Sequence, residues 1–137
     1  MPDGKNNCGK KEKLFVTGVA GFFGSHVADA FKSSGHPVPG HDNSIGGYKD
    51  NVPESAEYYE VDLTDFVTLC QVMRGIHIVY HCAATAYEGL SVFSPRLVSH
   101  HGFDASTQHF LLQYGMALVG LHVVPPWHDM VLRKCLL

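Results

Sequence analysis

The sequence lacks any apolar run near the roughly 20 residues that a membrane-spanning helix needs. Its first 12 residues are polar and rich in lysine, and no apolar stretch follows them that resembles the central part of a secretion signal. We therefore expect a flexible N-terminal tail over residues 1–12 and no membrane partner.

Positive charge is also scarce. The chain has 10 lysines and arginines against 13 acidic residues, a formal net charge of −3, and its basic residues are scattered along the sequence. Nucleic-acid binding depends on a basic patch or stripe, so we expect no nucleic-acid partner.

Cysteine pairs spaced for redox or metal chemistry are absent. No two of the four cysteines form a C-x-x-C pair, and two of them fall in apolar segments, where a reduced thiol behaves as a small hydrophobe. The histidines, including His100 and His101, lack cysteine or carboxylate companions at the spacing of a metal site. We expect a cytoplasmic protein without a bound metal.

What the sequence does contain is enough apolar material for one domain, 45% of 137 residues, in alternating strand-like and helix-like segments. Helical patterns follow Gly21 and Asp65, and extended runs cover residues 13–17, 37–41, 57–61 and 76–83. With right-handed crossovers, this β-α-β-loop-β-α-β order predicts an α/β fold of the Rossmann type. The expected architecture is a doubly wound parallel sheet with its ligand crevice at the carboxyl ends of the strands.

A glycine-rich turn, TGVAGFFG, joins the first expected strand to the first expected helix. Glycines at 18, 21 and 24 would let the chain turn sharply and let a pyrophosphate approach backbone N–H groups at the helix N-terminus. A glycine-rich turn that only reverses the chain is the alternative, because such patterns also recur by chance.

Asp42 closes the second expected strand, 18 residues after Gly24. A carboxylate at that distance is placed to meet the ribose hydroxyls of adenosine, and it favours NAD because a 2′-phosphate would meet like charge. The alternative is a turn residue at a strand end beside Asn43.

Four phrases, TGVAGFFGSH, HDNSIGG, VDLTD and VYHCAATAY, together resemble the extended short-chain dehydrogenase/reductases, specifically the NAD-dependent epimerase/dehydratase family. The resemblance implies an NAD site. Its pyrophosphate segment would be Gly18, Gly21, Phe22, Phe23 and Gly24. The adenosine segment would be Asp42 and Asn43 at the ribose with Asp62 and Leu63 at adenine, and Cys82, Ala83, Ala84 and Thr85 would pass along the cofactor.

Some of these positions have plainer interpretations. Asp62 could begin a turn with Thr64, and the paired alanines could serve only close packing between helix and strand. Pro37 and Pro39 also depart from an inner-strand pattern, because proline donates no ladder hydrogen bond. We expect irregular pairing there and a loosened ribose site.

The chemistry of the family rests on a Tyr-x-x-x-Lys pair, and the chain contains none. Tyr80, Tyr87 and Tyr114 are followed four residues later by alanine, serine and leucine. Tyr87 falls where the family meets its substrate, but a loop tyrosine is more often half-buried packing. No catalytic residue is therefore assigned.

The resemblance ends near residue 107, which divides the chain into the tail, an NAD-binding half-domain over 13–107 and a divergent segment over 108–137. We expect a sheet that stops after about the fourth strand and an irregular C-terminal tail. Read from the third base of each codon, 113–130 permits IRNGVGRFACCSSMARYG, which resembles the family's fifth strand. A reading-frame shift is therefore one hypothesis for this segment, and the coding DNA would test it.

Three functional classes remain open at this point. In the leading one, the chain is the NAD-binding N-terminal portion of a sugar-nucleotide epimerase or dehydratase and is inactive alone. The full-length enzyme would take a nucleotide-sugar substrate. The second is a stand-alone dinucleotide-binding module that acts through a partner. The third is a non-functional fragment that binds nothing, because half a sheet exposes an apolar edge.

Overall fold

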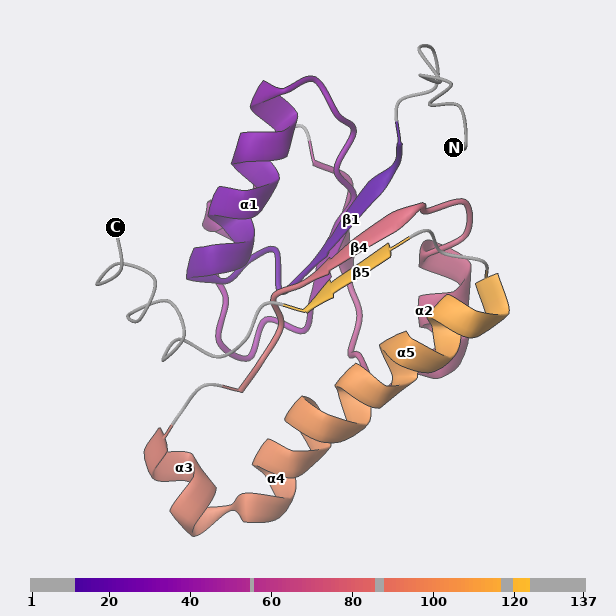
Figure 1. The fold of residues 1–137 in the computed structure, drawn as a ribbon. Helices are drawn as coiled ribbons and strands as arrows, with labels where there is room; N and C mark the ends of the chain where they lie inside the picture. The colour runs from indigo at the N-terminus through magenta and orange to yellow at the C-terminus, as the bar shows by residue number, and fades with distance from the viewer. Residues whose placement is uncertain (1–11, 55, 86–87, 117–119, 124–137) are drawn as a thin grey trace, which may run out of the picture.

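The computed structural model describes residues 12–54, 56–85, 88–116 and 120–123. Five parallel strands form one sheet in the order β3-β2-β1-β4-β5. The strands are β1 Leu14–Thr17, β2 Gly40–Asp42, β3 Tyr58–Glu60, β4 Ile78–His81 and β5 Gly120–Val123. This sheet confirms the predicted Rossmann-type α/β fold (Figure 1).

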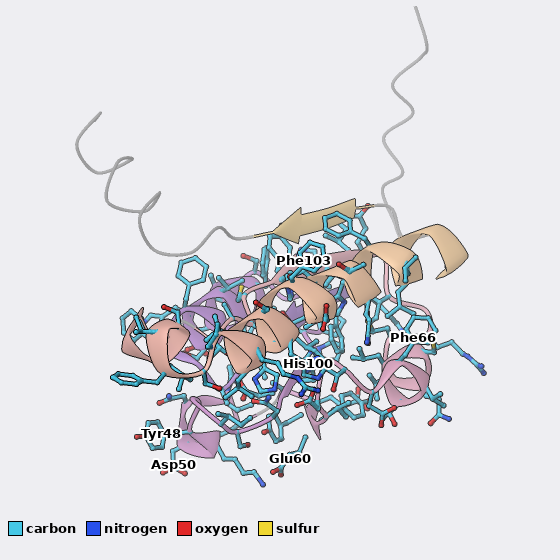
Figure 2. All side chains as sticks on the ribbon, turned by 90° about the horizontal axis from the view of Figure 1, so that it is seen from below. Tyr48, Asp50, Glu60, Phe66, His100 and Phe103 are labelled. Atoms are coloured by element: carbon cyan, nitrogen blue, oxygen red, sulfur yellow. The ribbon has the colours of Figure 1, made fainter. Side chains whose placement is uncertain are left out.

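Helices cover both faces of the sheet, as a doubly wound fold requires (Figure 1). The helices are α1 Phe22–Ser33, α2 Phe66–Val72, α3 Glu88–Phe93, α4 Pro95–Ser99 and α5 Ala105–Met116. A short 3-10 turn, η1, spans Lys49–Asn51, and a π-helical turn, η2, spans His100–Asp104. Because η2 joins α4 to α5 without a break, these three elements form one continuous helical segment (Figures 1 and 2).

Alternating side chains of β1 divide the core between the two faces, because successive strand residues point to opposite sides of a sheet. Phe15 packs in the cluster that includes Leu69 of α2 and Leu112 of α5. Val16 packs in a second cluster, with Ala28 of α1. The two faces thus bury separate apolar layers, and α1 and α5 are held on opposite sides of β1.

The register aligns the carboxyl ends of the three inner strands. Thr17 of β1 is paired with His41 of β2 on one side and with His81 of β4 on the other. In-register residues of neighbouring strands share a face, so these three side chains point toward the same side of the sheet. The segments that follow β1, β2 and β4 therefore all begin at the carboxyl edge of the sheet.

The prolines that were expected to disturb the second strand lie just before it. β2 is only three residues long and starts at Gly40, so neither Pro37 nor Pro39 has to donate a ladder hydrogen bond. The Pro39 carbonyl instead accepts from Val16 N at 3.1 Å. The expected strand over 37–41 is thus displaced toward its C-terminal end, and it finishes on Asp42.

The sheet continues one strand beyond the expected fourth. β5 pairs in parallel with β4, with Ile78 opposite Gly120 and His81 opposite Val123. The expectation of a sheet ending near the fourth strand is corrected, because the open edge of β4 supplies hydrogen-bond partners for a segment with little sequence periodicity of its own. Residues 124–137 and Tyr87 lie outside the described part of the chain.

Candidate functional site: a cavity at the carboxyl edge of the sheet

Two positions of the turn between β1 and α1 can hold only glycine for steric reasons. Gly18 has φ +67°, and a Cβ added there would lie 2.8 Å from Ala83 Cα. A Cβ added to Gly24 would lie 2.1 Å from the Gly18 carbonyl oxygen. Both positions therefore exclude a side chain, the first against the end of β4 and the second inside the turn itself.

The N-terminus of α1 is left open to a ligand. Its N-cap is Gly21, which provides no side-chain cap, and the first turn of the helix carries no acidic residue. The first N–H groups of a helix have no partner within the helix, and the helix dipole places positive charge there. The start of α1 is therefore suited to an anionic group such as a pyrophosphate.

Asp42, the last residue of β2, is buried and held by two backbone donors. Ala20 N donates to Oδ2 at 3.2 Å, and Ser44 N donates to Oδ1 at 2.8 Å. The carboxylate thereby links the glycine turn to the loop after β2 and keeps the charge at the cavity wall. The loosening expected from the two prolines is not observed, because these bonds hold Asp42 independently of them.

Asp62 is fixed in a network at the end of β3. Asn43 Nδ2 donates to Oδ2 at 3.1 Å, and Thr64 donates to Oδ1 from both its N–H and its hydroxyl, at 2.8 and 2.6 Å. Burial alone would raise the pKa of Asp62, but these hydrogen bonds and nearby His101 outweigh it and hold the pKa below its ordinary value. Asp62 therefore adds a second negative charge to the cavity.

The Thr17 side chain is hydrogen-bonded to the backbone that follows β4. Its hydroxyl oxygen accepts from Cys82 N and Ala83 N, each at 3.1 Å, and lies 2.8 Å from His81 Nδ1. Burial raises the pKa of the Cys82 thiol to about 12, so Cys82 remains a neutral thiol. The segment that leaves β4 is thus anchored by its backbone and contributes small, uncharged side chains.

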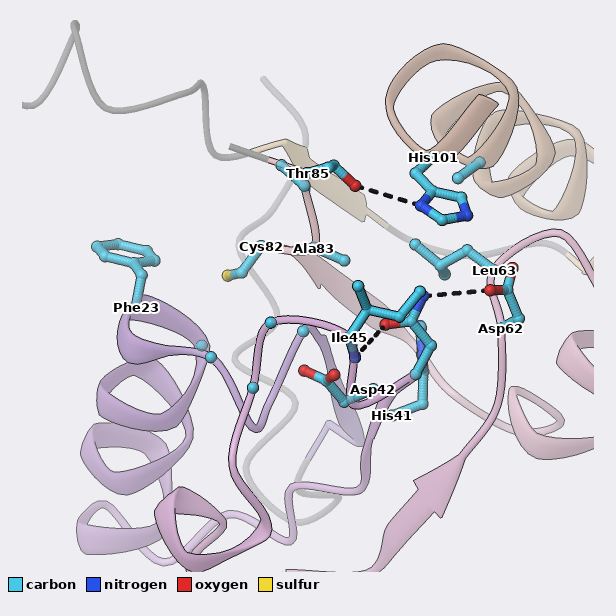
Figure 3. A pocket seen from close by; sticks show the side chains of 18 of the residues that line it. Phe23, His41, Asp42, Ile45, Asp62, Leu63, Cys82, Ala83, Thr85 and His101 are labelled. Carbon is cyan, nitrogen blue, oxygen red and sulfur yellow. Dashed lines mark hydrogen bonds between the residues drawn. The ribbon is translucent and has the colours of Figure 1, made fainter. Parts of the chain in front are cut away.

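These elements surround one cavity of about 290 Å³ at the carboxyl edge of the sheet (Figure 3). All thirteen positions that the sequence proposed for cofactor binding line it. They are Gly18, Gly21, Phe22, Phe23, Gly24, Asp42, Asn43, Asp62, Leu63, Cys82, Ala83, Ala84 and Thr85. No lysine or arginine is among the described residues of the lining. The glycine cradle, the uncapped helix start and the buried carboxylate fit a dinucleotide.

Further lining residues were missed from the sequence: His41, Ile45, Gly46, Gly47, Val61, His101 and Ala105. The glycine pair that follows Asn43 was a usable signal. A Cβ at Gly47 would lie 2.7 Å from the Ala20 carbonyl carbon, so glycine lets this loop close on the turn before α1. His101 comes from a helical segment of no recognisable motif and had no such signal.

The described residues contain neither a membrane-spanning helix nor a metal-binding cluster. None of the described helices is both long and apolar enough to cross a membrane. In the same part of the chain, no three histidine, cysteine or carboxylate side chains are arranged to hold a metal ion.

A parallel sheet wound on both faces, with a glycine turn and a cavity at its carboxyl edge, defines a Rossmann-type α/β protein. The chain belongs to the NAD dependent epimerase/dehydratase family, whose model matches residues 14–108. This match confirms the resemblance found in the sequence.

The curated relatives include UDP-glucose 4-epimerases and decarboxylases of UDP-linked sugar acids. The UDP-glucose 4-epimerase of Corynebacterium glutamicum is 38% identical over 88 residues, which make up 64% of this chain and 27% of that protein. The Thermotoga maritima UDP-glucose 4-epimerase structure with UDP-glucose has a TM-score of 0.79 and 26% identity, covering 81% of this chain and 37% of that one. The Thermus thermophilus UDP-glucose 4-epimerase structure, a complex with NAD, has a TM-score of 0.71 and 31% identity, covering 76% and 35%. The chain thus spans about a quarter of the length of the curated relatives it matches.

Proposed function

We propose that this chain binds NAD as the N-terminal portion of a sugar-nucleotide epimerase or dehydratase, and that it does not complete the catalytic cycle alone. The observation that carries the proposal is the meeting of all thirteen expected positions in one cavity. Bound NAD would supply hydride acceptance and return. The chain's own residues bind and orient the cofactor.

The preference for NAD over NADP rests on Asp42. The backbone donors Ala20 N and Ser44 N hold its carboxylate in place at the cavity wall. A ribose with a free 2′-hydroxyl can donate to this carboxylate, whereas a 2′-phosphate would be repelled by it. The absence of arginine and lysine from the described lining leaves that phosphate without a counter-charge.

The proposal that the chain is inactive alone rests on the missing Tyr-x-x-x-Lys pair. The cavity offers Asp42, Asp62, Cys82 and two histidines, but Cys82 is a neutral thiol and both carboxylates are engaged by hydrogen bonds. The full-length relatives include an epimerase solved with UDP-glucose. A nucleotide-sugar substrate therefore belongs to a longer protein of which this chain would be the cofactor-binding part.

The binding test is calorimetric titration of the full 137-residue chain with NAD and with NADP. We expect saturable NAD binding and at least about tenfold weaker NADP binding. Asp42→Ala should lose NAD binding, and Asp50→Ala, at an exposed acid of η1, should not. Circular dichroism would establish that each variant is folded. A folded wild-type chain that does not bind NAD would contradict the proposal.

The catalytic part of the proposal has its own test. The chain, supplied with NAD and UDP-glucose, should produce no UDP-galactose above the buffer background. Turnover by the purified chain would overturn the assignment of an inactive portion while leaving NAD binding intact.

A further inference from the structure

Of two consecutive histidines in η2, only His101 lines the cavity. The His100 side chain is 49% exposed, and its Nδ1 lies 2.9 Å from Asp104 Oδ2. His101 is half-buried and lines the cavity. Figure 2 labels His100 on the helical segment, and Figure 3 shows His101 reaching toward the cavity from the same segment.

Both histidines belong to the π-helical turn. A π-helical turn has a wider repeat than an α-helix and is often found at functional sites. Its C-terminal end is anchored, because the Ser106 hydroxyl donates to the Gly102 carbonyl at 2.7 Å and lies 2.9 Å from His81 Nε2. The turn that carries His101 is thereby tied to the end of β4.

His101 lies between two walls of the cavity. Its Nδ1 is 3.3 Å from Thr85 Oγ1, in the segment that follows β4. It also acts electrostatically on Asp62, at the end of β3. The imidazole is therefore a polar group that the helical segment brings to the ligand space, beside the groups supplied by the strand ends (Figure 3).

We propose that His101 is a cofactor-binding residue that closes the cavity over the adenosine diphosphate half of the ligand, an inference that rests on the NAD binding proposed above. The neighbouring Asp62 and Asn43 mark this half, because they follow β3 and β2. An imidazole has two ring nitrogens, so one can remain with Thr85 while Nε2 serves the ligand. The flat ring can also stack against a base.

The test compares His101→Ala with His100→Ala in titrations of the full chain with NAD and with ADP. We expect His101→Ala to weaken both ligands by about tenfold, the effect of losing one good hydrogen bond to a charged group. His100→Ala changes the neighbouring residue of the same turn but leaves the cavity intact, so it should stay within about twofold of wild type. His101→Gln, which keeps a polar donor, should recover part of the loss.

Each outcome decides a separate point. Equal NAD affinity for the wild type and a folded His101→Ala overturns the inference, and weakened NAD with unchanged ADP overturns its adenosine placement. If His101→Ala does not fold, the same comparison is made with His101→Leu, which preserves volume without a polar atom. If the wild-type chain does not bind NAD, the proposed function is contradicted, and this inference with it.

Discussion

The His109 ring of α5 lies 4.8 Å, centroid to centroid, from the His81 ring at the end of β4, and both side chains are buried. His41 joins them, with its ring 6.1 Å from that of His109. Among the described residues, neither ring nitrogen of His109 has a hydrogen-bond partner, and neither does His41 Nε2. Three imidazoles thus occupy an interior that disfavours their charged forms.

Folding stability should therefore fall on mild acidification. Burial lowers the pKa of His41 and of His81 from 6.5 to about 4, and burial together with the other two rings lowers that of His109 to about 2. The unfolded chain binds these protons first, so stability is present above pH 6.5 and is lost as the pH falls toward 4. Each group contributes a slope of about 1.4 kcal/mol per pH unit.

Part of this effect is opposed by the hydrogen bond of His41 to the Val61 carbonyl and by the charge of Asp62, since each raises the pKa of His41. Urea denaturation at a series of pH values from 7.5 to 4.5 would measure the slope, as an order-of-magnitude check. A free energy of unfolding that stays flat across this range would contradict the buried, neutral state of the cluster.

His109→Leu should stabilise the protein. Leucine is apolar, and it removes two buried ring nitrogens that have no hydrogen-bond partner. We expect a gain of about 1 to 3 kcal/mol at pH 7 and a shallower acid slope. Leu111→Ala, at an exposed position of the same helix, is the matched control and should change stability little. A destabilised His109→Leu would show that the ring serves a partner.

Thr17→Val should cost about 2 to 3 kcal/mol of folding stability, because its methyl group cannot accept from Cys82 N and Ala83 N. Thr107→Val is a matched control. Thr107 is exposed and only bonds back to the Phe103 carbonyl of its own helical segment, so the change should be within about 0.5 kcal/mol. Urea denaturation of both variants would test this, and equal effects would contradict the anchoring role of Thr17.

The succession of the first four strands along the chain was predictable, because the glycine turn and the apolar runs are local signals. β5 was not, since four residues next to Pro125 and Pro126 have little pattern of their own and become a strand through pairing with β4. The displacement of β2 has a similar cause. The sequence indicated an extended run there, but the residue at which ladder pairing begins is set by the two prolines and by pairing with β1.

The candidate site likewise has residues that the sequence could predict and residues that it could not. The residues after β1, β2, β3 and β4 could be predicted together, because parallel strands bring their carboxyl ends to one edge. His101 could not, because nothing in the sequence distinguishes it from the adjacent His100, and only the structure shows which of the two lines the cavity. His41 is placed by its register with Thr17, which no single-sequence pattern reports.

Cys82 should react slowly with alkylating reagents despite lining the cavity. Burial raises the pKa of its thiol to about 12, so little thiolate is present at neutral pH. We expect iodoacetamide at pH 7.5 to modify Cys82 at least about tenfold more slowly in the folded chain than in urea, as measured by mass spectrometry of the peptide. Equal rates would show that the thiol is not shielded.

Gly21 and Gly24 should separate cofactor binding from folding. A Cβ at Gly24 would clash with the Gly18 carbonyl at 2.1 Å, whereas a Cβ at Gly21 would approach the same oxygen at 3.2 Å, which a small shift can relieve. We expect Gly24→Ala to lower the free energy of unfolding by several kcal/mol, about the size of a severe steric change, and Gly21→Ala to lower it by about 1 kcal/mol.

Gly21→Ala should weaken NAD binding in a protein that remains folded. Gly21 lines the cavity at the start of α1, so a methyl group there occupies space that a pyrophosphate needs beside the backbone N–H groups. Calorimetry of Gly21→Ala should give at least about tenfold weaker NAD binding in a chain that still unfolds cooperatively. Gly89→Ala is the control, since a Cβ at Gly89 meets nothing within 4 Å and lies outside the cavity lining. Unchanged NAD affinity in Gly21→Ala would place the pyrophosphate away from the helix start.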